Sequence, residues 1–191
     1  MTDFDILKSM IKKEHITEAE PCGKLHKIVL KEDCPTSTYS VNITDVPRNS
    51  IAIKTDAFPD AKDFFDKSKS GKELLKRADF VVIAKCVDGP RVLYVELTER
   101  KKSHGEITNQ LRGAKCVFDY CQSVGKMFWK HTDFLRNNTS HYLCVKMKGN
   151  CAQRRNFEKG APKSNLNDVP ERHHQFVRVE EVDFKIVTKR K

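Results

Sequence analysis

Residues 77–102 read RADFVVIAKCVDGPRVLYVELTERKK. Two apolar runs of strand length lie on either side of VDGPR, and a turn of this kind between such runs predicts a β-hairpin. Each run also carries one acid, Asp79 at the start of the first and Glu96 near the end of the second. Because antiparallel strands bring those two ends together, we expect both carboxylates to face one point.

The segments around the hairpin predict a mixture of helices and strands. From His104 to Val124 apolar residues recur at three- and four-residue intervals, which predicts a helix with Ser103 as its N-cap. A second helix is expected within 3–14, and 34–50 and 59–76 are expected to be polar connections, the latter with one short helix. Further strands are expected at 24–33, 50–58, 141–147 and 176–187. The sum is an α/β or α+β fold, a mixed β-sheet of about five strands flanked by helices.

The bulk composition favours a folded protein with a polyanionic partner. The chain has 191 residues, which suits one domain, and 36 Lys+Arg against 26 Asp+Glu give a net charge of +10. Charge that serves only solubility is the alternative. We expect a single domain over 1–191, with a core at about 50–147, an N-terminal extension at 1–49 and a C-terminal basic loop and strand at 148–191.

The cysteines and the apolar segments indicate a cytoplasmic protein. Seven cysteines occur without any CxxC pair, which favours free thiols in a reducing compartment. The N-terminal residues have no apolar signal region, and no apolar run approaches the roughly 20 residues that cross a bilayer. We therefore expect no membrane partner.

The two hairpin acids suggest a metal site. Two hard oxygen ligands at the edge of an apolar sheet suit Mg²⁺, with water and a substrate phosphate completing the octahedron. The alternative is structural, because acids at strand ends often meet solvent and pair with neighbouring cations, here Lys76 or Arg77.

Over residues 50–147 the sequence resembles the PD-(D/E)XK nuclease superfamily. The resemblance rests on KRADFVV (76–82), VLYVELTER (92–100) and ITNQLRGAKCVFDY (107–120). It implies a restriction-endonuclease-like fold in which Asp79 and Glu96 are the metal-ligating acids. The Leu97 backbone carbonyl is implied as a further ligand, and Gln110 as the polar residue of the following helix.

One position departs from the superfamily pattern. The lysine expected two residues after the second acid is Thr98 here, on the same face of the strand as Glu96. That lysine stabilises negative charge developing at phosphorus, which a neutral hydroxyl does less well. Lys101 and Lys102 are the first candidates to replace it, and Lys85 and Lys54 remain open.

The sequence therefore predicts a Mg²⁺- or Mn²⁺-dependent nuclease, an enzyme acting on DNA or, as the second choice, RNA. The resemblance also suggests a defence or mobile-element setting and a protein partner or homodimer. The competing hypothesis is a catalytically impaired subunit that binds nucleic acid or protein, and Thr98 favours it. A further acid from Glu14 or Glu18 stays open, and we expect Phe128 and Trp129 to be buried in the core rather than stacked on bases. Arg154 and Arg155 are candidates for phosphate contacts.

Overall fold

A computed structural model describes residues 1–34, 37–59, 76–99, 101–147 and 167–189. In chain order these residues form α1 (Asp3–Met10), η1 (Lys13–His15), β1 (Ile16–Glu18), β2 (Glu20–Cys22), β3 (Leu25–Cys34), β4 (Ser37–Val46), β5 (Ser50–Lys54), β6 (Phe80–Cys86), β7 (Gly89–Thr98), α3 (His104–Phe128), β8 (Thr139–Lys146), η3 (Pro170–Arg172), β9 (His174–Val177), β10 (Glu181–Asp183) and α5 (Phe184–Val187).

The central sheet has six strands in the order β1-β5-β6-β7-β8-β9. Strands β1, β5, β6 and β7 pair antiparallel, whereas β7, β8 and β9 pair parallel. A parallel pair needs a long crossover, and α3 provides it between β7 and β8. Helix α3 begins directly after Ser103, because Ser103 and Glu106 form a reciprocal capping box that satisfies backbone N–H groups at the helix start.

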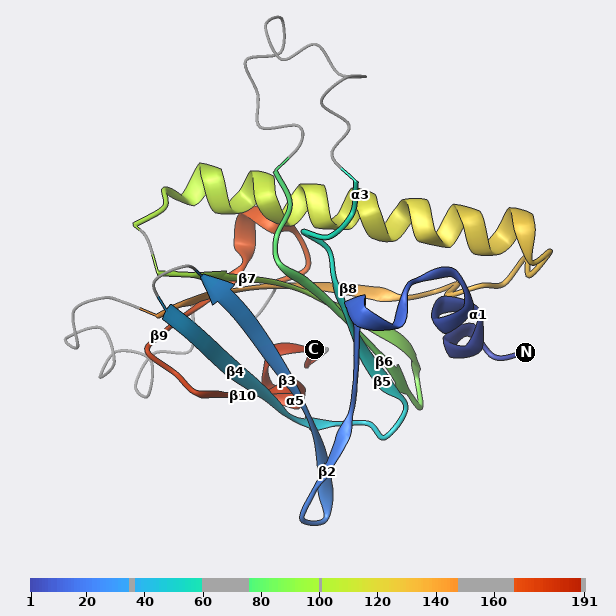
Figure 1. The fold of residues 1–191 in the computed structure, drawn as a ribbon, viewed down its shortest axis with the longest axis horizontal. Helices are drawn as coiled ribbons and strands as arrows, with labels where there is room; N and C mark the ends of the chain where they lie inside the picture. Colours follow the sequence, from blue (N-terminus) through green and yellow to red (C-terminus); the bar gives the residue numbers. More distant parts are fainter. Residues whose placement is uncertain (35–36, 60–75, 100, 148–166, 190–191) are drawn as a thin grey trace, which may run out of the picture.

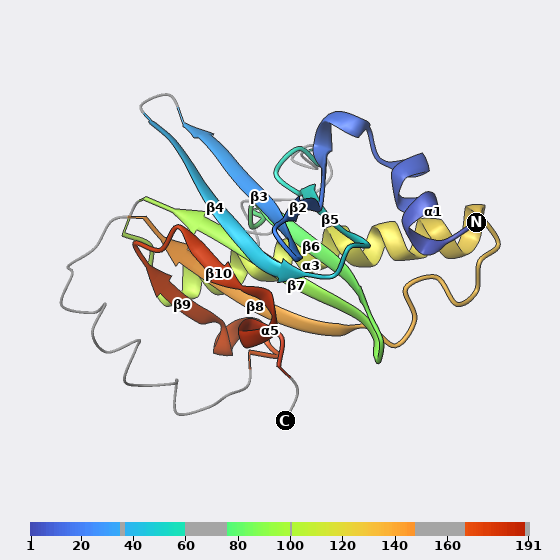
Figure 2. The same cartoon turned by 90° about the horizontal axis from the view of Figure 1, so that it is seen from below.

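Three layers stack on one another, as Figures 1 and 2 show from two directions. Helices α1 and α3 cover one face of the six-stranded sheet, and a four-stranded sheet in the order β10-β4-β3-β2 covers the other. Both faces of the central strands are therefore buried, which explains why β6 and β7 read as nearly continuous apolar runs.

The α+β fold, the hairpin at β6 and β7 and the long helix after it are confirmed. The prediction of one sheet with about five strands was wrong, because the described residues form two sheets. The predicted connection at 34–50 contains β4, whose Val41 and Ile43 are fully buried. The predicted strand at 176–187 is instead divided among β9, β10 and α5, because Asp183 caps a helical turn with its side chain.

No helix within the described ranges has the length and apolar character that crossing a membrane requires. The cysteines whose side chains the structure describes have free thiols: Cys22, Cys86, Cys116, Cys121 and Cys144.

Candidate functional site

The β6–β7 hairpin places Asp79 beside the end of β7. The last pair of the ladder is Phe80 with Val95, so Asp79 lies just beyond it. In place of a further ladder bond, the Asp79 carboxylate accepts a hydrogen bond from the Leu97 N–H at 2.6 Å between Oδ2 and N. The Asp79 carbonyl accepts from the Thr55 N–H at 2.8 Å, which ties the segment to the end of β5.

Glu96 lies on the face of β7 that α3 covers. Side chains alternate along a strand, and Val92 and Tyr94 on the same face pack in the core beneath that helix. The Glu96 side chain is 0% exposed, and the Lys102 ammonium lies 2.5 Å from its Oε1 atom. Its second oxygen, Oε2, is buried and has no hydrogen-bond partner among the residues described.

Burial dominates the electrostatics of the two acids. Desolvation raises the pKa of Glu96 to about 7, although the Lys102 charge and a hydrogen bond from Gln110 act in the opposite direction. The pKa of Asp79 lies well above its usual value because of burial and the nearby Glu96 charge, and the Leu97 N–H offsets this only in part. At neutral pH the pair is thus close to gaining or losing a proton, a property that clusters at functional sites.

The other residues of the predicted site lie around the same strand end. Gln110 is 8% exposed and points its amide toward the Arg77 carbonyl, 3.4 Å from Nε2, as well as toward Glu96. Leu97 is buried between Asp79 and the Tyr39 hydroxyl, which donates to the Leu97 carbonyl at 3.4 Å. Thr98 is 3% exposed at the end of β7.

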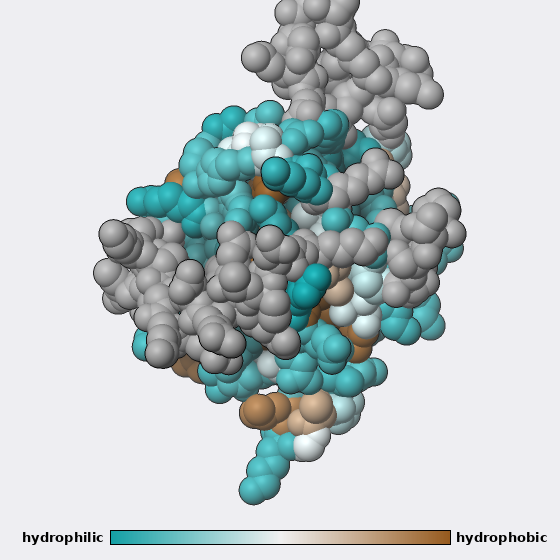
Figure 3. Space-filling view, turned by 90° about the vertical axis from the view of Figure 1, so that its left-hand side faces the viewer, coloured by the Kyte–Doolittle hydropathy of each residue, from teal (hydrophilic) through white to brown (hydrophobic). Residues whose placement is uncertain are grey.

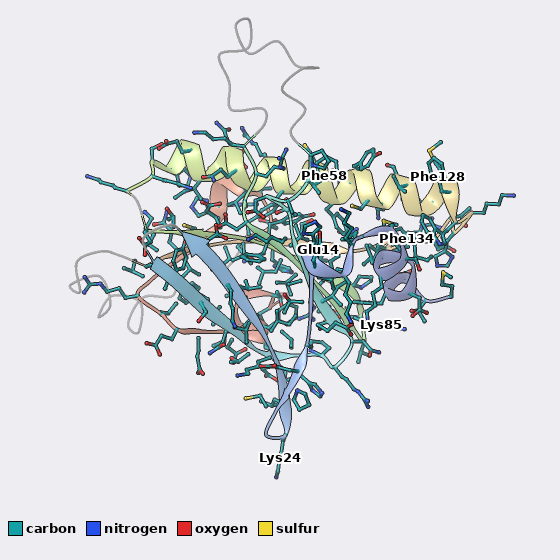
Figure 4. The ribbon with its side chains drawn as sticks, viewed as in Figure 1. Glu14, Lys24, Phe58, Lys85, Phe128 and Phe134 are labelled. Carbon is teal, nitrogen blue, oxygen red and sulfur yellow. The ribbon has the colours of Figure 1, made fainter. Side chains whose placement is uncertain are left out.

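Of the candidate replacement cations, Lys102 reaches the site. Lys101 is exposed at the surface. Lys54 lies 3.8 Å from Asp56 instead, as an ion pair. Lys85 is in the half of β6 next to the hairpin turn, and Figure 4 shows it far from the strand end that carries Asp79. Of the two lysines predicted after the second acid, Lys102 is the one that contacts Glu96, and its role in place of the motif lysine stays a prediction.

Sequence reasoning missed Glu32, which lies on β3 in the second sheet. Its negative charge contributes to the raised pKa of both Asp79 and Glu96. The early acids left open make other contacts: Glu18 pairs with Lys8, and Glu14 lies near Lys12 and His15. A usable signal was present, because Ile28 and Leu30 alternate as core residues and Glu32 continues their stripe.

The arrangement fits a divalent cation in part. The Glu96 Oε2 atom, together with the Asp79 carboxylate and the Leu97 carbonyl, supplies the hard oxygen donors that Mg²⁺ and Mn²⁺ prefer. In the part of the chain that is described, however, no three His, Cys, Asp or Glu side chains already converge on one ion-sized point. The donor chemistry suits such an ion, and Lys102 is the cation that the structure places beside it.

No family model, curated protein or solved structure matches this chain.

Figure 3 shows the face at which α3 begins, where the coloured atoms are mostly hydrophilic. The expectation that Phe128 is buried was wrong, because it is 77% exposed at the end of α3, where Figure 4 labels it. Trp129 does pack partly against the core. The candidates Arg154 and Arg155 lie outside the described residues.

Proposed function

We propose that the protein is a divalent-metal-dependent nuclease that hydrolyses phosphodiester bonds in DNA, with RNA as the second substrate class. One observation carries the proposal most of all. Glu96 is a fully buried carboxylate beside a second buried acid, Asp79, in a basic protein, and its Oε2 has no hydrogen-bond partner among the described residues. Burying such a pair lowers stability, so a functional reason for keeping it is the economical explanation.

The order of elements supports the same proposal. Strand β6, the turn, strand β7, helix α3 and strand β8 follow one another along the chain, and this order of strand, turn, strand, helix and strand agrees with the core that the resemblance to the PD-(D/E)XK nucleases implies. Asp79 directly precedes β6, Glu96 lies on β7 and Gln110 lies on the helix after the hairpin. This agreement supports the family assignment as a proposal.

In the proposed mechanism, Asp79, Glu96 and the Leu97 carbonyl would hold Mg²⁺ or Mn²⁺. Such an ion, when bound, polarises the phosphodiester and lowers the pKa of an attacking water. Glu96 has a pKa of about 7, so it can exchange a proton at neutral pH. Lys102 supplies positive charge beside Glu96, where the superfamily has a lysine on the strand, and can stabilise charge developing at phosphorus.

The test is cleavage of supercoiled plasmid and single-stranded DNA in the presence of Mg²⁺, Mn²⁺ or EDTA. We expect metal-dependent cleavage by the wild type and at least about a hundredfold loss in Glu96→Gln. Glu106→Gln is the matched control, because it removes the same charge from the start of α3 while glutamine can preserve the capping box. Equal activity of the wild type and Glu96→Gln would refute the proposed nuclease site.

A second candidate function is favoured by Thr98, which takes the place of the motif lysine. In this second candidate, the protein is a subunit that binds nucleic acid or another protein and keeps the fold but does not cleave phosphodiester bonds. The net charge of +10 suits a polyanion in either case. Salt-dependent DNA binding with no metal-dependent cleavage in the same assay would select this candidate, whereas binding that competing DNA does not affect would point to a protein partner. A cytoplasmic location and a defence setting belong to the proposal as well.

A further inference from the structure

A pocket lies on the α3 face of the six-stranded sheet, away from the two hairpin acids. It has a volume of about 450 Å³, the size of a small-molecule site, and four parts of the chain line it. These are the segment from the end of α1 to η1, the end of β5, the loop after β5 and the middle of α3. Most of its surface is apolar and comes from side chains such as Met10, Ile53, Val117 and Val124.

The charge at the pocket is positive. Two ammonium groups line it, those of Lys12 and Lys54, and no carboxylate of the described residues does. The nearest acids are Glu14, 3.9 Å from Lys12, and Asp56, 3.8 Å from Lys54. Both ion pairs are partly exposed, and exposed pairs are weak, so an incoming anion can replace the carboxylates. The pocket therefore suits a ligand that joins an apolar group to a negative charge.

Two aromatic rings form part of the pocket wall. The rings of Phe58 and Tyr120 meet edge to face, with their centroids 5.6 Å apart, and Figure 4 shows Phe58 beside the middle of α3. Tyr120 is 58% exposed, so much of its ring is open to a ligand. An exposed ring beside cations is the combination with which proteins stack the bases of single-stranded nucleic acid and hold its backbone.

The segment before β6 connects this pocket to the candidate site. Arg77 donates a hydrogen bond to the Phe58 carbonyl at 2.7 Å, and its guanidinium lies 5.7 Å from the centre of the Phe58 ring. Two residues further on, the Asp79 carbonyl accepts from the Thr55 N–H at 2.8 Å. The loop that carries Phe58 is thus fixed to the same short segment that carries the first acid.

We propose that this pocket binds an unpaired nucleotide of a single-stranded substrate, with the base stacked on Tyr120 and the phosphates near Lys12 and Lys54. This inference rests on the proposed function, because it takes the substrate to be a nucleic acid, and it names that substrate as single-stranded. A base in a duplex enters such a pocket only after it is unpaired and unstacked. Tyr120 follows Gln110 by ten residues on α3, or about 15 Å, so a few nucleotides of one strand span the pocket and the acids.

Fluorescence anisotropy of a labelled single-stranded oligonucleotide, titrated with the full chain in EDTA, tests the inference without cleavage. We expect Tyr120→Ala to weaken the affinity at least about fivefold, and Tyr120→Phe, which keeps the ring, to stay within about twofold of the wild type. Phe128→Ala is the control, because it removes a ring that is 77% exposed on the same helix but does not line the pocket. Its affinity should also stay within about twofold of the wild type. A duplex of the same sequence should bind Tyr120→Ala and the wild type equally.

The salt dependence of binding tests the position of the phosphates. Replacing both Lys12 and Lys54 by glutamine should reduce the slope of log affinity against log salt by about 1.4, because each phosphate contact of a single strand contributes about 0.7. An unchanged slope would overturn the placement of the backbone at these two lysines. Circular dichroism of each variant checks that it is folded.

Three results would overturn the base pocket itself. They are wild-type affinity for the single strand in Tyr120→Ala, an equal loss of affinity for the duplex, and a wild type that binds no single strand. Thymidine monophosphate that binds as tightly as the oligonucleotide would replace the strand by a free nucleotide as the ligand and so overturn the inference as well. The loss of cleavage expected in Glu96→Gln is measured separately, so the nuclease proposal can stand when the pocket fails.

Discussion

Replacing Glu96 by glutamine should stabilise the protein above neutral pH. Glutamine approximates the protonated carboxyl, so Glu96→Gln removes the penalty of burying a charge while keeping the shape. The pKa of Glu96 is raised from 4.5 to about 7 in the folded chain, with the Lys102 pairing already included. That difference corresponds to roughly 3 kcal/mol against folding once the group is ionised in both states.

The pH dependence has a definite sign. Between the ordinary pKa of 4.5 and the folded value of about 7, folded Glu96 keeps a proton that the unfolded chain has released. The free energy of unfolding of the wild type therefore falls as pH rises through this window, and the raised pKa of Asp79 acts in the same direction. The advantage of Glu96→Gln should be small at pH 4.5 and full at pH 8.

Urea denaturation of both proteins in EDTA, at pH 4.5 and pH 8, measures this directly. We expect a gain of up to roughly 3 kcal/mol at pH 8, or roughly 6–12 °C in Tm for a chain of this size. Glu106→Gln is the opposite control, because the Ser103 N–H lowers the pKa of Glu106 and its charge is therefore favourable to folding. A Glu96→Gln protein less stable than the wild type by the same amount at both pH values would refute the reasoning and mark the Glu96–Lys102 pair as a structural ion pair.

Two further substitutions test the packing and charge around the site. Lys102→Ala should lower the free energy of unfolding by about 2 kcal/mol at pH 8, where Glu96 is ionised, and by much less at pH 4.5, where Glu96 is protonated. Urea titration of Lys102→Ala, alone and combined with Glu96→Gln, measures this. Gly113→Ala should destabilise by roughly 1–3 kcal/mol in thermal denaturation, since the added Cβ would overlap the Lys76 carbonyl oxygen, whereas Gly105→Ala has open space and should not destabilise. A Lys102→Ala loss that is independent of pH, or equal melting of the two glycine variants, would contradict these expectations.

The sequence predicted the part of the fold in which local chemistry is explicit. The turn between β6 and β7 and the Ser103 cap of α3 depend on residues next to one another in the chain. The signal for the second sheet is the alternation in YSVNITDV (39–46), in which Val41 and Ile43 are buried. The polar residues between them led to the prediction of a connection instead of a strand. Period-2 signals in short polar strands are weak, because one face of each strand meets solvent.

In the candidate site, too, the contacts fixed by neighbouring residues could be predicted from the sequence, and those that depend on distant packing could not. The hairpin register was enough to predict that Asp79 and Glu96 lie together, because it is fixed by the turn. The contact of Lys102 with Glu96 depends on how the chain turns between β7 and α3, so the spacing selected the lysine pair but not the member. Glu32 is far away in sequence, and only the packing of one sheet on the other brings it near Asp79.

The position of Lys102 bears on what Thr98 means. A lysine at position 98 would extend from β7 itself, on the face of Glu96 that α3 covers. Lys102 instead reaches Glu96 from the segment before the Ser103 cap, and its side chain is 26% exposed, so it can exchange the carboxylate for solvent or for a phosphate without moving a strand. In the absence of another cation it neutralises part of a buried negative cluster. Under the proposed function, Glu96 would hold the divalent ion and Lys102 would supply positive charge for the phosphate, and we then expect turnover to depend on the Lys102 side chain.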